Sequence, residues 1–173
     1  MAIINNDSIS KFNDADELIN FLVLNRYEPE NRDILETNKF ELLPDYIRYV
    51  ILIADFDTEY EMQGIFTTIE NSIGHYLSDI AFSFTQTGNN EIAKYIIDIL
   101  KALSDYNLSP DKLRNAKAGK YKEFDIVKGN SLDNEELINR IDEIDSKLGP
   151  LIYEKTHWDH IINFVANRLA ERS

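Results

Sequence analysis

The sequence predicts an all-α fold, a single-domain multi-helix bundle of about seven to nine helices with a short irregular basic loop. Apolar residues recur at spacings of three and four along most of the chain, which is the period of a helix with one buried face. Hydrophobic residue types supply 43% of the 173 residues, and only six Gly and four Pro interrupt them. A chain of this length and composition can bury one sizeable core and is not expected to be disordered.

Residues 1–42 are predicted to form an N-terminal helical region. Asn13 is the predicted N-cap of a helix that runs to about Tyr27, because acidic residues follow it and the start of a helix favours negative charge. Pro29 interrupts this pattern. Residues 31–40 are therefore predicted to be a short helix or an irregular linker.

Residues 43–106 are predicted to be the core region, and Pro44 is expected to open its first helix. Leu52 and Ile53 make the second face of this helix apolar too, which indicates a helix buried on most sides. A buried strand is the alternative, because the apolar run is short and β-branched. The apolar stripe consists of Ile47, Val50, Ile51 and Ala54.

Three more helices are predicted in the core region, over residues 58–71, 75–87 and 90–104. The last of these is the clearest, because one face is apolar and the other is charged. Gly74 and Gly88 are candidate helix stops. The apolar face consists of Ile92, Tyr95, Ile96, Ile99, Leu100 and Leu103.

Residues 107–173 are predicted to hold the C-terminal helices. Ser109 and Pro110 begin a short helix, and residues 119–130 are expected to be the basic loop, or a small hairpin. A helix from Ser131 is predicted to end at Gly149 and Pro150, and the last helix to run from Leu151 to about Ala170. Its predicted buried residues are Leu151, Trp158, Ile162, Val165 and Leu169.

The formal net charge is −13, and it is unevenly distributed. Residues 112–128 carry a local charge of +4, so the remaining chain carries −17. Such a domain repels nucleic acid and attracts basic proteins, so no direct nucleic-acid binding is expected. Pairing of the basic segment with the acidic surface of a second copy is one route to a homodimer.

The chain has no cysteine, which mildly favours a reducing compartment. The N-terminus has no basic segment followed by a long apolar stretch, so no secretory signal is expected. The longest apolar run, residues 49–54, is far shorter than the ~20 residues that a spanning helix needs. These observations predict a cytoplasmic protein that does not bind membranes.

Acidic residues on outward helical positions are the predicted interaction surface. Carboxylates three or four residues apart on a helix lie ~4.5 to 6 Å apart along its axis, and duplex DNA presents a comparable array of phosphates. The surface could therefore imitate DNA. A solvated surface that serves only solubility is the alternative. The predicted surface residues are Asp55, Asp57, Glu59, Glu61, Glu135, Glu136, Asp142 and Glu143.

Glu154, His157 and His160 could approach a metal ion from one side of the last helix. Three ligands are a minimum, and partly exposed imidazoles beside Trp158 are the favoured interpretation. No nucleophile elbow, phosphate-binding loop or dinucleotide motif occurs in the sequence. The sequence therefore predicts no catalytic residue and no cofactor, and it favours a protein that is not an enzyme.

The middle of the chain carries a set of residues that are similar to a known pattern: Glu59, Gly64, Phe66, Asn71, Gly74 and Gly88. On these residues the chain resembles a family of bacterial all-helical proteins of unassigned function, one member of which is an acidic DNA mimic. In that family an Asn-Gly-Gly turn follows the Glu, and here Met62 and Gln63 replace the Asn and the first Gly. The resemblance implies a helical bundle, dimerisation, and occlusion of a DNA-binding partner in at least one relative.

The expected function is therefore a non-enzymatic interaction domain. Its acidic surface would occupy the nucleic-acid site of a basic partner, such as a DNA-binding protein. The alternatives are an antitoxin-like or immunity protein that blocks a toxin, and a metal-binding protein or enzyme that uses His157 and His160.

Overall fold

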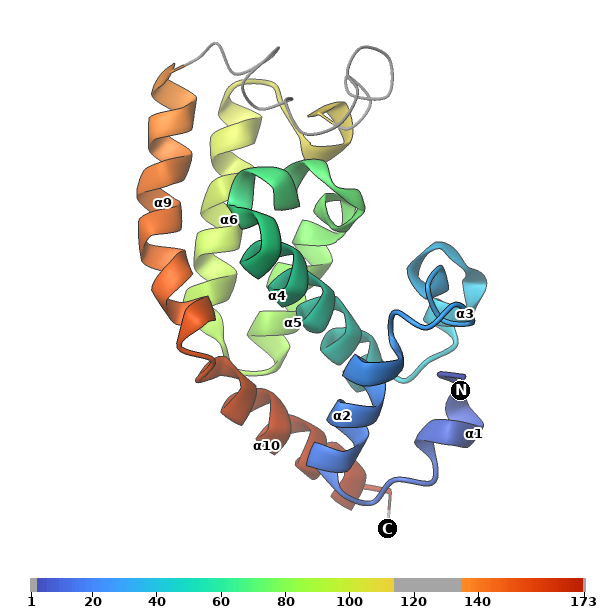
Figure 1. Ribbon diagram of the computed structural model, residues 1–173. Coiled ribbons are helices and arrows are strands. Elements are labelled where there is room, and N and C mark those ends of the chain that lie inside the picture. Colours follow the sequence, from blue (N-terminus) through green and yellow to red (C-terminus); the bar gives the residue numbers. More distant parts are fainter. Residues whose placement is uncertain (1–2, 114–134, 173) are drawn as a thin grey trace.

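The computed structural model describes residues 3–113 and 135–172, and these residues form helices and no strand (Figure 1). This confirms the predicted all-α, single-domain bundle. The predicted basic loop, residues 119–130, lies outside the described residues. The α-helices are α1 (Asn6–Ile9), α2 (Ala15–Asn25), α3 (Asn38–Glu41), α4 (Asp45–Glu70), α5 (Leu77–Gln86), α6 (Asn90–Asp105), α9 (Glu135–Tyr153) and α10 (His157–Ala170), and the 3₁₀ helices are η1 (Ile34–Glu36) and η2 (Ser72–Tyr76).

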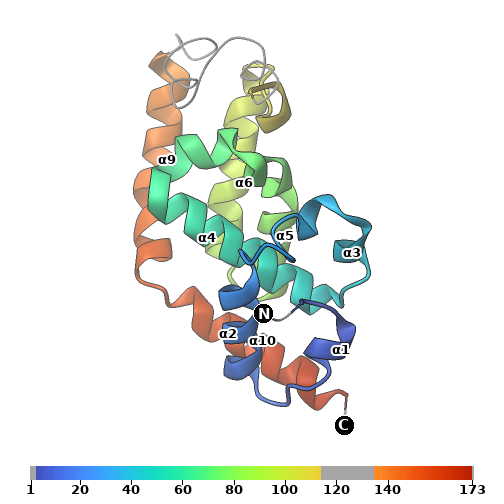
Figure 2. The ribbon, with the colours of Figure 1, turned by 45° about the vertical axis from the view of Figure 1, so that its right-hand side comes forward.

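Helix α4 is the central element of the fold. It contacts α2, α5, α9 and α10 and crosses the middle of the molecule in both ribbon views (Figures 1 and 2). Apolar residues on all sides of its first half are buried, among them Val50, Leu52 and Ile53. The predicted buried helix is therefore confirmed, and the alternative of a buried strand is wrong.

Two helices predicted separately, after Pro44 and over residues 58–71, are joined in α4. Gly64 interrupts the helical backbone with φ 75° and ψ 175°, so α4 consists of two helical segments that meet at a kink there. A side chain disfavours this backbone conformation, whereas glycine adopts it without a steric penalty. Pro44 was predicted to be the first residue of this helix. It is instead the N-cap, so α4 begins one residue later, at Asp45.

Helices α5, α6 and α9 pack in sequence, with α6 between the other two. The apolar face predicted for residues 90–104 is confirmed at Ile92, Ile96, Ile99 and Leu103, all of which are buried. Helix α10 runs on from α9 at an angle and packs on α2 and α4, which places the C-terminus near the start of α2 (Figure 1).

The C-terminal helix boundary was predicted in the wrong place. Gly149 and Pro150 lie inside α9, and the chain leaves the helix only at residues 154–156, where Lys155 has φ 60°. Gly149 fits here because a Cβ would lie 3.0 Å from the hydroxyl oxygen of Tyr60 on α4. The helix continues through Pro150, although proline is normally unfavourable inside a helix.

Two smaller differences occur near the N-terminus. The N-cap of α2 is Asp14 and not Asn13, since the Asp14 carboxylate accepts a hydrogen bond from the Glu17 backbone N–H at 2.9 Å. A short helix, α1, precedes it and has a capping box formed by Asn5 and Ser8. In the part of the chain that is described, no helix is long and apolar enough to cross a membrane.

Candidate functional site

Two of the eight predicted surface acids are not on the surface. Asp55 and Asp57 are each only 4% exposed. Both lie on α4, whose apolar stripe continues through their positions, so its packing carries them into the interior. Their predicted role in an exposed acidic surface is therefore wrong. A buried carboxylate needs a partner, and each of the two has one.

Asp55 forms a buried ion pair with Arg26. The guanidinium donates to Asp55 Oδ2 from Nε at 2.9 Å and from Nη2 at 2.7 Å. Arg26 also donates from Nη1 to the backbone carbonyl oxygens of Asn31 and Arg32. Burial raises the pKa of the Asp55 carboxyl, and the charge and hydrogen bonds of Arg26 oppose that shift. The pair ties the end of α2 and the following loop to α4.

Asp57 is the centre of a second cluster, which joins α4 to the junction of α9 and α10. Its Oδ2 accepts hydrogen bonds from His157 Nε2 and Trp158 Nε1, both at 2.8 Å, and lies 3.4 Å from Lys155 Nζ. We call Asp57, Lys155, His157 and Trp158 the Asp57 cluster. Lys155 and Trp158 were not predicted as partners of an acid. The sequence signal that could have indicated this cluster is the position of Asp57 on the apolar stripe of its helix, where a carboxylate needs a partner.

The next two acids on α4 are engaged in local contacts. Glu61 is exposed and forms an ion pair with Lys155. Glu59 is half-buried, and its Oε2 accepts a hydrogen bond from Asn71 Nδ2 at 2.5 Å. Glu59 therefore connects the two ends of the bent part of α4 and is not a free surface charge.

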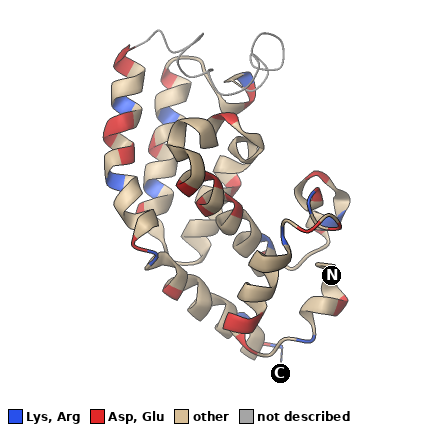
Figure 3. Cartoon of the chain, in the orientation of Figure 1, with Lys and Arg blue, Asp and Glu red and all other residues tan. Residues whose placement is uncertain are grey.

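The four acids predicted on α9 are exposed, but basic residues alternate with them. Lys147 pairs with Glu143 at 2.9 Å and lowers the pKa of that carboxyl, and Arg140 pairs with Asp105 of α6 at 2.6 Å. Figure 3 shows these alternating charges along α9. Glu135, Glu136 and Asp142 are exposed beside them. The eight predicted residues therefore do not form one continuous anionic row.

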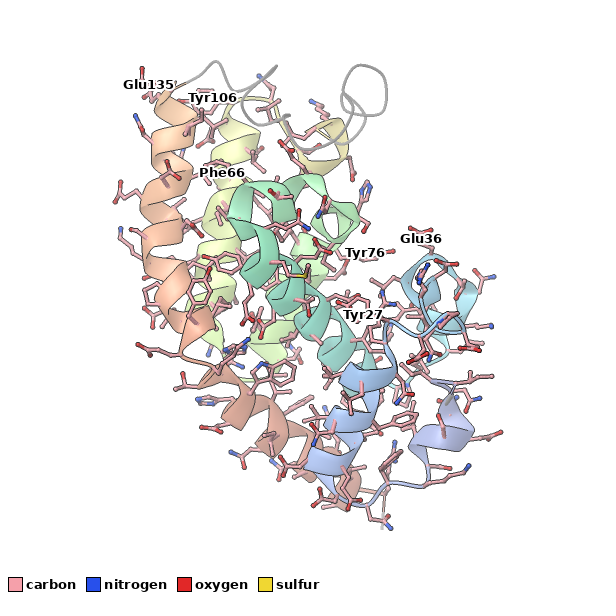
Figure 4. All side chains as sticks on the ribbon, in the orientation of Figure 1. Tyr27, Glu36, Phe66, Tyr76, Tyr106 and Glu135 are labelled. Carbon is pink, nitrogen blue, oxygen red and sulfur yellow. The ribbon has the colours of Figure 1, made fainter. Side chains whose placement is uncertain are left out.

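The residues that carry the family resemblance have structural roles. Gly64 forms the bend in α4, and Asn71 bridges it through Glu59. Gly74 allows a close approach, because a Cβ would lie 2.1 Å from the backbone oxygen of Ile69. Gly88 has φ 86° and follows the end of α5. Phe66, labelled in Figure 4, is partly buried and packs against the core.

The proposed metal ligands are not brought together. His157 is buried and its Nε2 binds Asp57, whereas Glu154 and His160 are exposed. Across residues 3–113 and 135–172, no group of three or more His, Cys, Asp or Glu side chains could hold a metal ion. The metal-binding alternative therefore has no geometric support.

The fold and these clusters define a class of protein: an all-α bundle in which two buried carboxylates, Asp55 and Asp57, hold helices together and most other described acids are exposed. No protein-family model, no curated protein and no solved structure matches the chain.

Proposed function

We propose that this protein is a non-enzymatic interaction domain that binds a basic protein through exposed carboxylates. The supporting observation is that the excess negative charge lies outside. Among the described acids, Asp55, Asp57 and Glu70 are buried, and Asp55 and Asp57 are paired with cations. Most acids of the described ranges are therefore on side chains that a partner can reach.

The exposed acids of the N-terminal part favour binding more than those of α9 do. Within the described ranges Glu41 pairs with Arg48, but the other seven make no ion pair, whereas α9 has compensating cations. We call these seven the N-terminal acids: Asp7, Asp14, Asp16, Glu17, Glu30, Asp33 and Glu36. An unpaired carboxylate attracts a cationic partner without first breaking an internal contact.

A DNA-binding protein is the proposed partner class. The sequence resemblance points to it, since one member of that family is an acidic DNA mimic. We further propose a cytoplasmic location and self-association as a homodimer, both on sequence arguments alone. The row of eight acids is not part of this proposal, because Asp55 and Asp57 are buried.

Affinity capture with the purified protein at two salt concentrations tests the proposal. We expect a basic protein to be retained at about 50 mM salt and released at about 300 mM, where the Debye length is shorter. Added duplex DNA should compete if the partner uses its DNA site. A partner that is retained equally at both concentrations would contradict the proposal.

A pair of matched triple variants locates the surface. Changing Glu30→Gln, Asp33→Asn and Glu36→Gln together should weaken capture several-fold. The control changes Glu135→Gln, Asp142→Asn and Glu143→Gln on α9, removes the same number of charges and should change capture less. Equal losses would show that only total charge matters and would exclude the N-terminal acids as the site.

A further inference from the structure

An apolar groove is lined by residues of α1, of α3 and of the segments that flank these helices. Figure 2 shows α1 and α3 on the same side of the molecule. The groove has a volume of about 470 Å³. Ile4 and Leu43 are buried beneath it, whereas Ile3 is 49% exposed and Leu42 is 71% exposed. We call it the α1–α3 groove. Its lining residues are Ile3, Ile4, Asn5, Asn6, Asp7, Lys39, Leu42 and Leu43.

Hydrogen bonds hold both sides of the groove in place. The Ile4 backbone N–H donates to Asn31 Oδ1 at 2.9 Å, and Asn6 Nδ2 donates to the Leu42 backbone oxygen at 3.2 Å. Asn31 is itself fixed by Arg26, which donates to its backbone oxygen at 3.0 Å. The Tyr76 hydroxyl, labelled in Figure 4, donates to the backbone oxygen of Leu35 at 2.9 Å and so ties η1 to η2. The groove is therefore preformed, which reduces the entropy lost on binding.

The charges around the groove are mainly negative. A smaller hollow of about 160 Å³ shares Ile3, Ile4 and Lys39 with the groove and adds Glu30 and Asp33 to its lining. Three exposed acids, Asp7, Glu30 and Asp33, thus surround the apolar surface with one base, Lys39. None of the three acids forms an ion pair within the described ranges.

We propose that the α1–α3 groove binds a short protein segment in which apolar side chains are flanked by Lys or Arg. The apolar side chains would cover Ile3 and Leu42, and the cations would contact Asp7, Glu30 and Asp33. Burial of the apolar surface supplies affinity, and the acids favour cationic segments over others. This inference rests on the proposed function and names the feature of the partner that the site recognises.

The negative charge around the groove disfavours two other occupants, a second copy of this chain and a membrane surface. A second copy docking here by twofold symmetry would bring Asp7, Glu30 and Asp33 close to their own counterparts, and like charges repel. An anionic membrane surface would be repelled for the same reason. A cationic peptide segment is the occupant whose charge fits.

Fluorescence anisotropy with synthetic peptides tests the groove directly. The probe is a labelled twelve-residue peptide with two adjacent leucines and two lysines on each side, and the comparison peptide has serines in place of the leucines. We expect Leu42→Ser to weaken binding of the leucine peptide about tenfold, which corresponds to about 1.4 kcal/mol. It should not change binding of the serine peptide.

Leu24→Ser is the matched control, because Leu24 is 76% exposed on α2 and does not line the groove. This variant should bind the leucine peptide like the original protein. If Leu24→Ser and Leu42→Ser weaken binding of the leucine peptide equally, or if neither weakens it, the proposal that the groove binds the peptide is overturned. Both substitutions are at exposed positions. Circular dichroism is the measurement that checks whether each variant is folded.

The same peptides separate failure of the groove from failure of the proposed function. Suppose that both lysine peptides bind in a salt-dependent way and that Leu42→Ser changes the affinity of neither peptide. The proposal for the groove is then wrong, whereas the proposal that exposed acids bind a basic partner is retained. If neither lysine peptide binds at about 50 mM salt, where charges are weakly screened, the groove is overturned. Salt-sensitive capture of a basic protein then decides the proposed function separately.

Discussion

At the scale of single residues, the buried carboxylates of α4 are structural ties. Asp57 holds His157, Trp158 and Lys155, which belong to the end of the chain, against the central helix. Asp55 does the same for Arg26 and the loop after α2. These residues are fixed by internal contacts, which leaves the exposed acids as the candidates for binding.

Replacing Asp57 should destabilise the fold strongly. Asp57→Ala leaves the ring nitrogens of His157 and Trp158 without their acceptor in the interior, so we expect a loss of about 3–5 kcal/mol in the free energy of unfolding. Asp57→Asn keeps an acceptor oxygen and should lose less. Urea unfolding measures both. Glu61→Gln, at the exposed ion pair, is the control, and a loss below about 1 kcal/mol for Asp57→Ala would contradict the role of the cluster.

At high pH, the stability of the folded state should depend on the protonation of Tyr27. Burial of part of the ring and the nearby Asp55 carboxylate raise the pKa of Tyr27 to about 12 from 10.0. The folded state thus keeps a proton that the unfolded state loses, so stability is fully present below pH 10 and is lost as the pH rises toward 12.

The measurement compares urea midpoints at pH 9 and pH 11 for the original protein and Tyr27→Phe. The midpoint of the original protein should fall more between these two pH values. An identical fall in the variant would show that other tyrosines account for the whole effect.

At the scale of secondary-structure elements, the bend in α4 is the main departure from regular geometry. The first part of the helix crosses the core, and the bend at Gly64 turns the last part toward η2. Glu59 and Asn71 bridge the bend with a hydrogen bond. Glu59, Gly64 and Asn71 therefore act together at one local feature of the backbone.

Gly64→Ala should destabilise the protein by about 1–3 kcal/mol, the cost of a strained backbone conformation. A Cβ at this position meets nothing within 4 Å, so the loss comes from the backbone and not from a clash. Thermal unfolding followed by circular dichroism measures it. Unchanged or increased stability would show that α4 can straighten without loss.

At the scale of the whole molecule, the exposed charge opposes folding while it favours a basic partner. A net charge of −13 on a 20.1 kDa chain produces repulsion among the exposed acids. Basic residues relieve that repulsion on α9, but less so in the N-terminal part. Three of the N-terminal acids that make no ion pair in the described ranges, Asp7, Glu30 and Asp33, lie beside the α1–α3 groove.

Salt should therefore stabilise the isolated protein. Raising the salt concentration from about 10 to about 300 mM screens the repulsion, and we expect a gain of about 1 kcal/mol, or about 2–4 °C in Tm. Differential scanning calorimetry measures the change. A Tm that falls with salt would show that the surface ion pairs outweigh the repulsion.

The sequence by itself determined the all-α class, the burial of α4 and the amphipathic face of α6, because apolar periodicity reports local structure directly. It misplaced the end of α9, since Gly149 and Pro150 usually mark a helix stop and here lie inside the helix, where Gly149 allows close approach to Tyr60. Only the tertiary structure decided which acids are exposed. Asp55 and Asp57 look like Glu59 and Glu61 in the sequence, but their cationic and ring partners come from up to 101 residues away. Spacing along one helix carries no information about contacts of that range.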